Sequence, residues 1–127
     1  MQNRKVYEYA VIRLVPRVER EEFLNVGVLL YCKRKRYLDI QYKLDQERIA
    51  AFAPQIDQSE IAEYLQAWYL ICKGDPKGGK IAQLEAAERF RWLSAAKSTI
   101  LQCSKVHTGL TEDASITIGT LFEKYVL

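Results

Sequence analysis

The chain has 127 residues, of which 28% are charged and 49% hydrophobic, and its formal net charge at pH 7 is +3. This length suits one globular domain, expected to span residues 1–127. Since no apolar run reaches about 18 residues, we expect no transmembrane helix, and we expect no secretory signal either. Three separated cysteines without a CxxC pair favour free thiols in a reducing cytoplasm over a disulfide scaffold.

Three strand-forming segments dominate the first third of the chain. Residues 6–15 are rich in β-branched and aromatic side chains and apolar on both faces, which predicts a central strand that ends at Pro16. Residues 26–32 form a nearly continuous apolar run, and residues 37–42 alternate as a strand with one wet face does. Residues 33–36 are all cationic, and we interpret them as the solvated tip of a β-hairpin, with a phosphate-contacting patch as the alternative.

Two helices are predicted next. Asp45 is the expected N-cap of a short helix that Pro54 ends, and Asp57 with Glu60 has the spacing of a capping box before a longer helix. The longer helix carries an apolar stripe at helical spacing, made of Ile61, Leu65, Trp68 and Cys72. The pattern favours burial of this stripe against the sheet.

The last third is predicted to hold a helix over residues 81–93, a strand over residues 98–102 and a final helix from a Thr111 cap through Tyr125. Residues 115–118 also alternate as a strand does, so that alternative stays open. Because strands come early and helices late, the predicted fold class is α+β. We expect an antiparallel sheet of three to four strands with helices packed mainly on one face.

Local motifs with a possible chemistry are incomplete. Residues 74–80 nearly match a phosphate-binding loop, but Ile81 stands where a hydroxyl is needed and a helix precedes the segment, which favours an interhelical loop. Cys103 and His107 could form a nucleophilic pair, although a buried thiol and a histidine bonded to the loop are favoured. Gly27 within a strand indicates a bulge or the close approach of a backbone or ligand. No metal site or cofactor is expected.

Charge is distributed unevenly along the chain. Residues 1–36 contain nine basic and four acidic side chains, whereas residues 37–127 contain ten basic and twelve acidic ones. Much of the excess is the run at residues 33–36. A third reading is therefore nucleic-acid binding through this tip, which would weaken steeply with salt.

Two groups of segments resemble a known family. Residues 9–16 and 21–28 contain a Glu-Phe-x-Asn-Val-Gly-Val motif, and residues 90–93, 98–99 and 104–110 contain a His-Thr-Gly motif. They resemble the small bacterial proteins of domain of unknown function 3037. The resemblance implies an accessory or partner role with a HipA-like kinase, because members are often encoded beside one, and it implies no established activity.

The polar motif residues are the candidate functional residues. They are Arg13, Glu21, Glu22, Asn25, Arg91, Lys97, Ser98, Thr99 and His107. Lys97 is a mild departure, since the family more often has arginine there. If the first and fourth strands are neighbours, these side chains could converge at one edge of the sheet.

The leading function is a non-enzymatic cytoplasmic partner protein, acting with a HipA-like kinase. The alternative is a small enzyme or ligand-binding domain for a phosphate-bearing molecule. In that alternative four residues would bind the anion: Arg13, Arg91, Lys97 and His107. Glu21 or Glu22 would then serve as the base.

Overall fold

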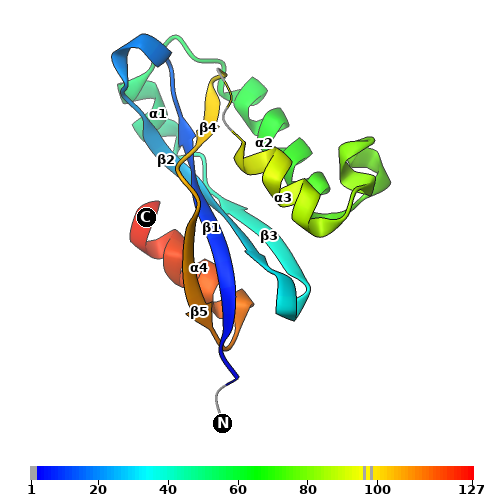
Figure 1. Ribbon diagram of the computed structural model, residues 1–127. Coiled ribbons are helices and arrows are strands. Elements are labelled where there is room, and N and C mark those ends of the chain that lie inside the picture. Colours follow the sequence, from blue (N-terminus) through cyan, green and yellow to red (C-terminus); the bar gives the residue numbers. More distant parts are fainter. Residues whose placement is uncertain (1–2, 96, 98) are drawn as a thin grey trace.

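The computed structural model describes residues 3–95, 97 and 99–127. Within them, five strands form one antiparallel sheet in the order β3-β2-β1-β4, and β5 also pairs with β1 (Figure 1). The strands are β1 (Lys5–Leu14), β2 (Leu24–Cys32), β3 (Tyr37–Tyr42), β4 (Leu101–Cys103) and β5 (His107–Thr111). Since β1 has partners on both edges, its predicted central position is confirmed, and so is the α+β class.

Strands β4 and β5 follow one another along the same edge of β1. Between them, the Ser104 N–H donates to the Val11 carbonyl oxygen at 2.8 Å, and its hydroxyl accepts from the Val11 N–H at 2.9 Å. The predicted strand over residues 98–102 is therefore placed too early, and β5 was not predicted at all. Most of β5 is exposed, so its strand structure depends on pairing with β1 rather than on an apolar pattern of its own.

Four α-helices are present in the described residues. They are α1 (Gln46–Phe52), α2 (Gln58–Lys73), α3 (Ala86–Ser94) and α4 (Ala114–Tyr125). The predicted caps of the first two are confirmed, because the Asp45 side chain accepts from the Arg48 N–H and the Asp57 side chain from the Ser59 and Glu60 N–H groups. Each cap satisfies donors that the first helical turn leaves free.

The boundaries of the last two helices differ from the predictions. Residues 81–83 form only a 3₁₀ turn. Leu84 then adopts an extended conformation that interrupts the helix, so α3 begins at Ala86. Helix α4 is capped by Asp113 rather than by Thr111, whose hydroxyl accepts from the Asp113 N–H. Residues 115–118 are helical, with Ile118 buried, so the strand alternative is wrong.

Two apolar cores lie on opposite faces of the sheet. Leu29 of β2 belongs to the core that α1, α2 and α3 cover, whereas Val28 and Leu30 belong to the core that α4 covers. Because successive strand residues point to opposite faces, burial on both sides explains the continuous apolar run of β2. The expected placement of helices mainly on one face thus applies to α1, α2 and α3, while α4 lies on the other. No described helix has the length and apolar character to cross a membrane.

The caps of α2 and α4 make the fold sensitive to acid. Hydrogen bonds from the Ser59 hydroxyl and nearby backbone N–H groups lower the pKa of Asp57, and Ser115 and Ile116 do the same for Asp113. A carboxyl with a lower pKa in the folded state stabilises above its unfolded pKa, near 3.9, and loses that contribution as pH falls through the folded pKa.

We therefore expect the free energy of unfolding to decrease as the pH falls below about 4. The double variant Asp57→Asn and Asp113→Asn keeps a capping oxygen but cannot titrate, so its free energy should decrease less over the same range. Urea unfolding at a series of pH values measures both slopes. Equal slopes for the two proteins would show that these caps do not contribute to acid sensitivity.

Candidate functional site

A cationic cavity of about 630 Å³ lies between the start of β1, the β2–β3 hairpin tip and α3. Five cations line it: Arg4, Lys5, Lys33, Arg34 and Arg91. Glu8 is the one carboxylate among its lining residues, and Val6, Tyr31 and Ala87 complete the wall. We call this the basic cavity. Its charge favours an anionic ligand.

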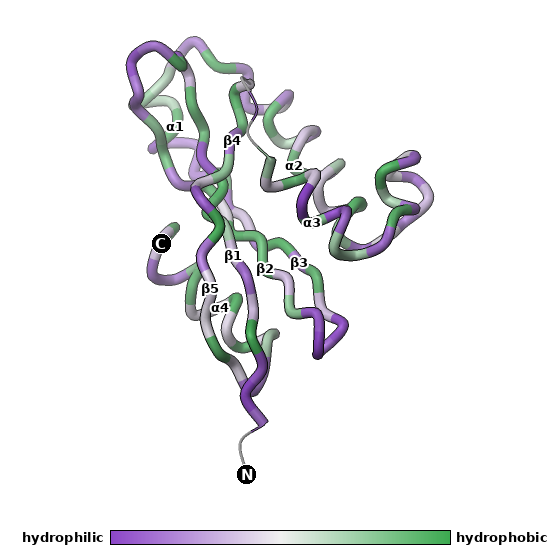
Figure 2. The backbone as a smooth tube through the Cα atoms, viewed as in Figure 1, coloured by the Kyte–Doolittle hydropathy of each residue, from purple (hydrophilic) through white to green (hydrophobic). Residues whose placement is uncertain are grey.

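The hairpin tip divides its four cations into two pairs. Residues Lys33–Lys35 form a 3₁₀ turn, and Arg36 follows in the left-handed region with φ of 51°, so the predicted hairpin tip is confirmed. All four side chains are exposed, and Figure 2 shows the tip as a hydrophilic end of the hairpin. Lys33 and Arg34 line the basic cavity, whereas Lys35 and Arg36 do not.

A second cavity, of about 400 Å³, is mostly aromatic and aliphatic. It is lined by Tyr64, Trp68, Trp92, Lys97, Thr99, Ile100 and Leu101, and we call it the aromatic groove. The Lys97 ammonium lies 4.7 Å from the centroid of the Trp92 ring and donates to the carbonyl oxygens of Trp92 and Leu93 at the end of α3. Burial lowers the pKa of Lys97. Lys97 thus caps the C-terminus of α3, a common role for a cationic side chain.

Arg13 and Asn25 face each other across the β1–β2 pair. The Asn25 amide donates to the Tyr125 carbonyl oxygen at 3.0 Å, which ties β2 to the end of α4. The Arg13 guanidinium lies 4.1 Å from the centroid of the Phe23 ring. Among the described residues, buried Nε of Arg13 and Oδ1 of Asn25 have no hydrogen-bond partner. The amide nitrogen of Asn25 therefore has a structural contact, and its oxygen has none in the described part of the chain.

Cys103 and His107 do not form a nucleophilic pair. Burial raises the pKa of the Cys103 thiol to about 12, and the thiol donates to the Leu93 carbonyl oxygen at 3.5 Å. His107 is exposed, and its ring centroid lies 5.3 Å from that of Tyr9, which packs against the core under α4. A catalytic thiol needs a lowered pKa and an adjacent base, and Cys103 has neither.

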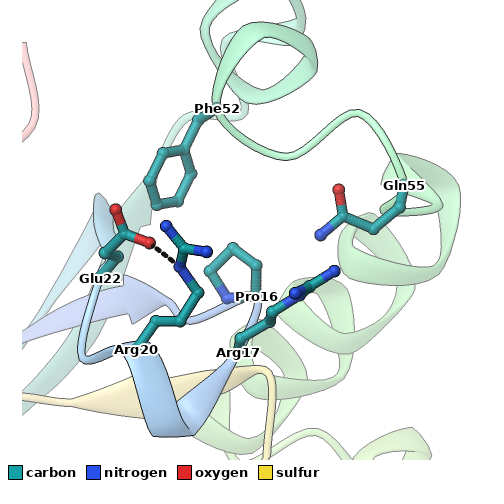
Figure 3. A pocket seen from close by; sticks show the side chains of 6 residues that line it. All are labelled: Pro16, Arg17, Arg20, Glu22, Phe52 and Gln55. Atoms are coloured by element: carbon teal, nitrogen blue, oxygen red, sulfur yellow. Dashed lines mark hydrogen bonds and ion pairs between the residues drawn. The ribbon is translucent and has the colours of Figure 1, made fainter.

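Glu22 is held by an arginine. It lines a cavity of about 290 Å³ together with Arg17, Arg20 and Phe52, and the Arg20 guanidinium donates to its carboxylate (Figure 3). Glu21 is exposed beside the 3₁₀ turn Val18–Arg20 and adopts a left-handed conformation with φ of 57°. The Glu22 carboxylate therefore already accepts a hydrogen bond from a side chain two residues away.

The candidate residues lie in several places. Arg91 lines the basic cavity and Glu22 the cavity of Figure 3; Lys97 and Thr99 line the aromatic groove. Arg91 is on α3, on the face opposite the Tyr9 ring that His107 contacts. Ser98 lies outside the described residues. These cavities share no lining residue, so they do not form one site.

Sequence reasoning missed the contribution of Arg4 and Lys5 to a site. Both belong to the basic excess of residues 1–36, which was the only signal for them. Their neighbours in space, Lys33, Arg34 and Arg91, are far from them in sequence. Tyr64 of the aromatic groove was missed as well, because it is one exposed tyrosine of a helix.

Comparison with known proteins supports the family resemblance of the motif segments. A family model described as Protein of unknown function (DUF3037) matches residues 9–126. Neither a curated protein nor a solved structure matches the chain. The matched range includes both motif groups, Lys33, Arg34 and Arg91, and it begins after Arg4 and Lys5.

Proposed function

Since the chain belongs to the DUF3037 family, we propose that it is a non-enzymatic cytoplasmic protein of bacteria that binds a HipA-like kinase as its partner. The partner is the one that the family resemblance implies. The observation that carries the proposal is the aromatic groove, because motif residues Trp92, Lys97 and Thr99 line it. The groove is where a segment of the kinase docks.

The groove has the composition of a protein-binding surface. Trp92 and Tyr64 are 40% and 47% exposed, while Trp68 is buried beneath them. Large aromatic side chains that stay partly exposed in a concave surface are common anchors of protein interfaces. The Lys97 ammonium is occupied by backbone carbonyl oxygens, so the groove offers rings and aliphatic stems. An apolar segment of the partner fits this surface best.

The side chains considered for catalysis support a binding role. The Cys103 thiol has a raised pKa, Glu22 is paired with Arg20, and His107 contacts Tyr9 on the face opposite α3. Each of these side chains thus has a contact of its own within the fold.

We expect Trp92→Ala to weaken binding to the HipA-like kinase about thirtyfold, because the loss of an aromatic anchor typically costs about 2 kcal/mol. Leu84→Ala is the matched control, because Leu84 is 39% exposed against 40% for Trp92 and does not line the groove. Isothermal titration calorimetry with the purified kinase measures both affinities. Absence of binding by the unchanged chain at micromolar concentration, or equal losses in the two variants, would contradict the proposal.

A second candidate function, binding of a phosphate-bearing molecule, is favoured by the basic cavity. Of the four residues expected to hold the anion, Arg91 lines this cavity, whereas Arg13, Lys97 and His107 do not. The cationic lining supports the binding of an anionic ligand.

A further inference from the structure

We propose that the basic cavity binds a small molecule that carries at least two phosphate groups. This inference deepens the second candidate function, because it names the residues and the class of ligand. It does not depend on the aromatic groove, which shares no lining residue with the basic cavity.

The first argument is the convergence of charge. Three segments far apart in sequence bring their cations to one cavity: the start of β1, the hairpin tip and α3. The ion pairs of the described residues are Arg20–Glu22 and Lys73–Asp39, so no cation of the basic cavity is paired in that part of the chain. Like charges gathered in a concavity raise its positive potential, which a multiply charged anion offsets.

The second argument is the geometry of the donors. Arg34 and Arg91 come from different walls of the cavity, and guanidinium groups bind phosphate through two parallel hydrogen bonds. Lys33 adds a flexible ammonium beside Arg34. A ligand with two or more phosphate groups can therefore place one group on each guanidinium.

The third argument concerns the apolar part of the lining. Val6 belongs to β1 and Tyr31 to β2, and the Tyr31 ring stacks on Phe90 of α3, with 5.6 Å between the ring centroids. This part of the lining therefore belongs to the sheet rather than to a loop. A preformed concave surface of this kind is typical of small-molecule sites.

The size of the cavity favours a small ligand over a nucleic acid. Its volume of about 630 Å³ is within the range of small-molecule sites. A nucleic-acid backbone would follow an extended cationic face and contact all four tip residues. A small ligand inside the cavity contacts Lys33 and Arg34 and leaves Lys35 and Arg36 in solvent. The two pairs therefore distinguish the ligands.

The experiment compares two double variants of the full chain with equal loss of charge. The first is Lys33→Gln with Arg34→Gln, and the control is Lys35→Gln with Arg36→Gln. Inorganic tripolyphosphate is the probe, and calorimetry at physiological salt measures its affinity. A single-stranded oligonucleotide is titrated in parallel by fluorescence anisotropy. All four side chains are exposed, so both variants are expected to fold, which circular dichroism checks.

We expect the chain to bind tripolyphosphate and the first variant to bind it at least about tenfold more weakly, because two charge-assisted contacts are lost. The control should change the affinity less than twofold, and Arg91→Gln should weaken it as the first variant does. Equal losses in both double variants, no binding of tripolyphosphate, or binding of the oligonucleotide alone would overturn the proposal. The first variant should bind the kinase as the unchanged chain does, so failure of this proposal and failure of the partner proposal are distinguishable.

Discussion

Replacing Phe90 with alanine is expected to lower the free energy of unfolding by about 3–5 kcal/mol. Phe90 is 2% exposed and is one of the largest fully buried side chains of the core. Its ring stacks on Tyr31, so it joins α3 to the sheet. Truncation removes buried apolar area and leaves a cavity, and both effects destabilise. Urea unfolding at neutral pH, followed by circular dichroism, measures the loss.

Phe52→Ala makes the same truncation at a more exposed position. Phe52 is 37% exposed at the end of α1, so its loss should cost clearly less than that of Phe90. Similar losses in the two variants would contradict the assignment of Phe90 to the centre of the core. Similar losses would also contradict the packing of α3 against the sheet, which positions Ala87 and Arg91 beside the basic cavity.

Gly27→Ala is expected to destabilise the protein by about 1–3 kcal/mol, the usual cost of overpacking. A methyl group at Gly27 would lie 2.8 Å from the Gln41 carbonyl oxygen and 3.1 Å from Cδ1 of Ile12. The first of these contacts is with the backbone of β3, which can yield only if the β2–β3 pair shifts. The strain therefore falls on the strand that separates the two cores. The same urea unfolding measures the change.

Gly119→Ala is the matched control with the opposite expected sign. Gly119 lies inside α4, and a methyl group there would meet nothing within 4 Å. Alanine favours a helix interior over glycine by about 0.5–1 kcal/mol, so this variant should be more stable. A stabilising Gly27→Ala, or a destabilising Gly119→Ala, would contradict the packing around β2 and α4.

The close approach at Gly27 shows how far a local pattern can predict a site. A glycine within an apolar strand indicates a bulge, or the close approach of a backbone or a ligand. The structure has a register shift beside Gly27, between its β1 partner Ile12 and Arg13, and the backbone of β3 lies close to Gly27 as well. Asn25, two residues earlier, also has a structural contact, because its amide nitrogen holds the end of α4. These two motif residues therefore have structural contacts within the fold.

Elements with a local signal can be predicted from the order of the amino acids alone. Apolar segments rich in β-branched residues predicted the first two strands, which are buried on both faces of the sheet. Alternation predicted the third strand, because burial of one face imposes a period of two. Side chains that cap their own helix predicted the starts of α1 and α2. The family motifs were visible for the same reason, since they are contiguous.

Elements and sites that depend on partners distant in sequence become visible only in the folded chain. Strand β5 is short and mostly exposed, so it exists as a strand because β1 supplies its hydrogen bonds. Leu84 interrupts a helical pattern, which shows that periodicity alone does not fix a boundary. The basic cavity brings residues 4, 33 and 91 together, and no sequence motif links residues so far apart along the chain. The net charge of +3 therefore gave no indication that five cations line one cavity. A net charge is a sum over the whole chain and carries no information about where folding places each charged side chain.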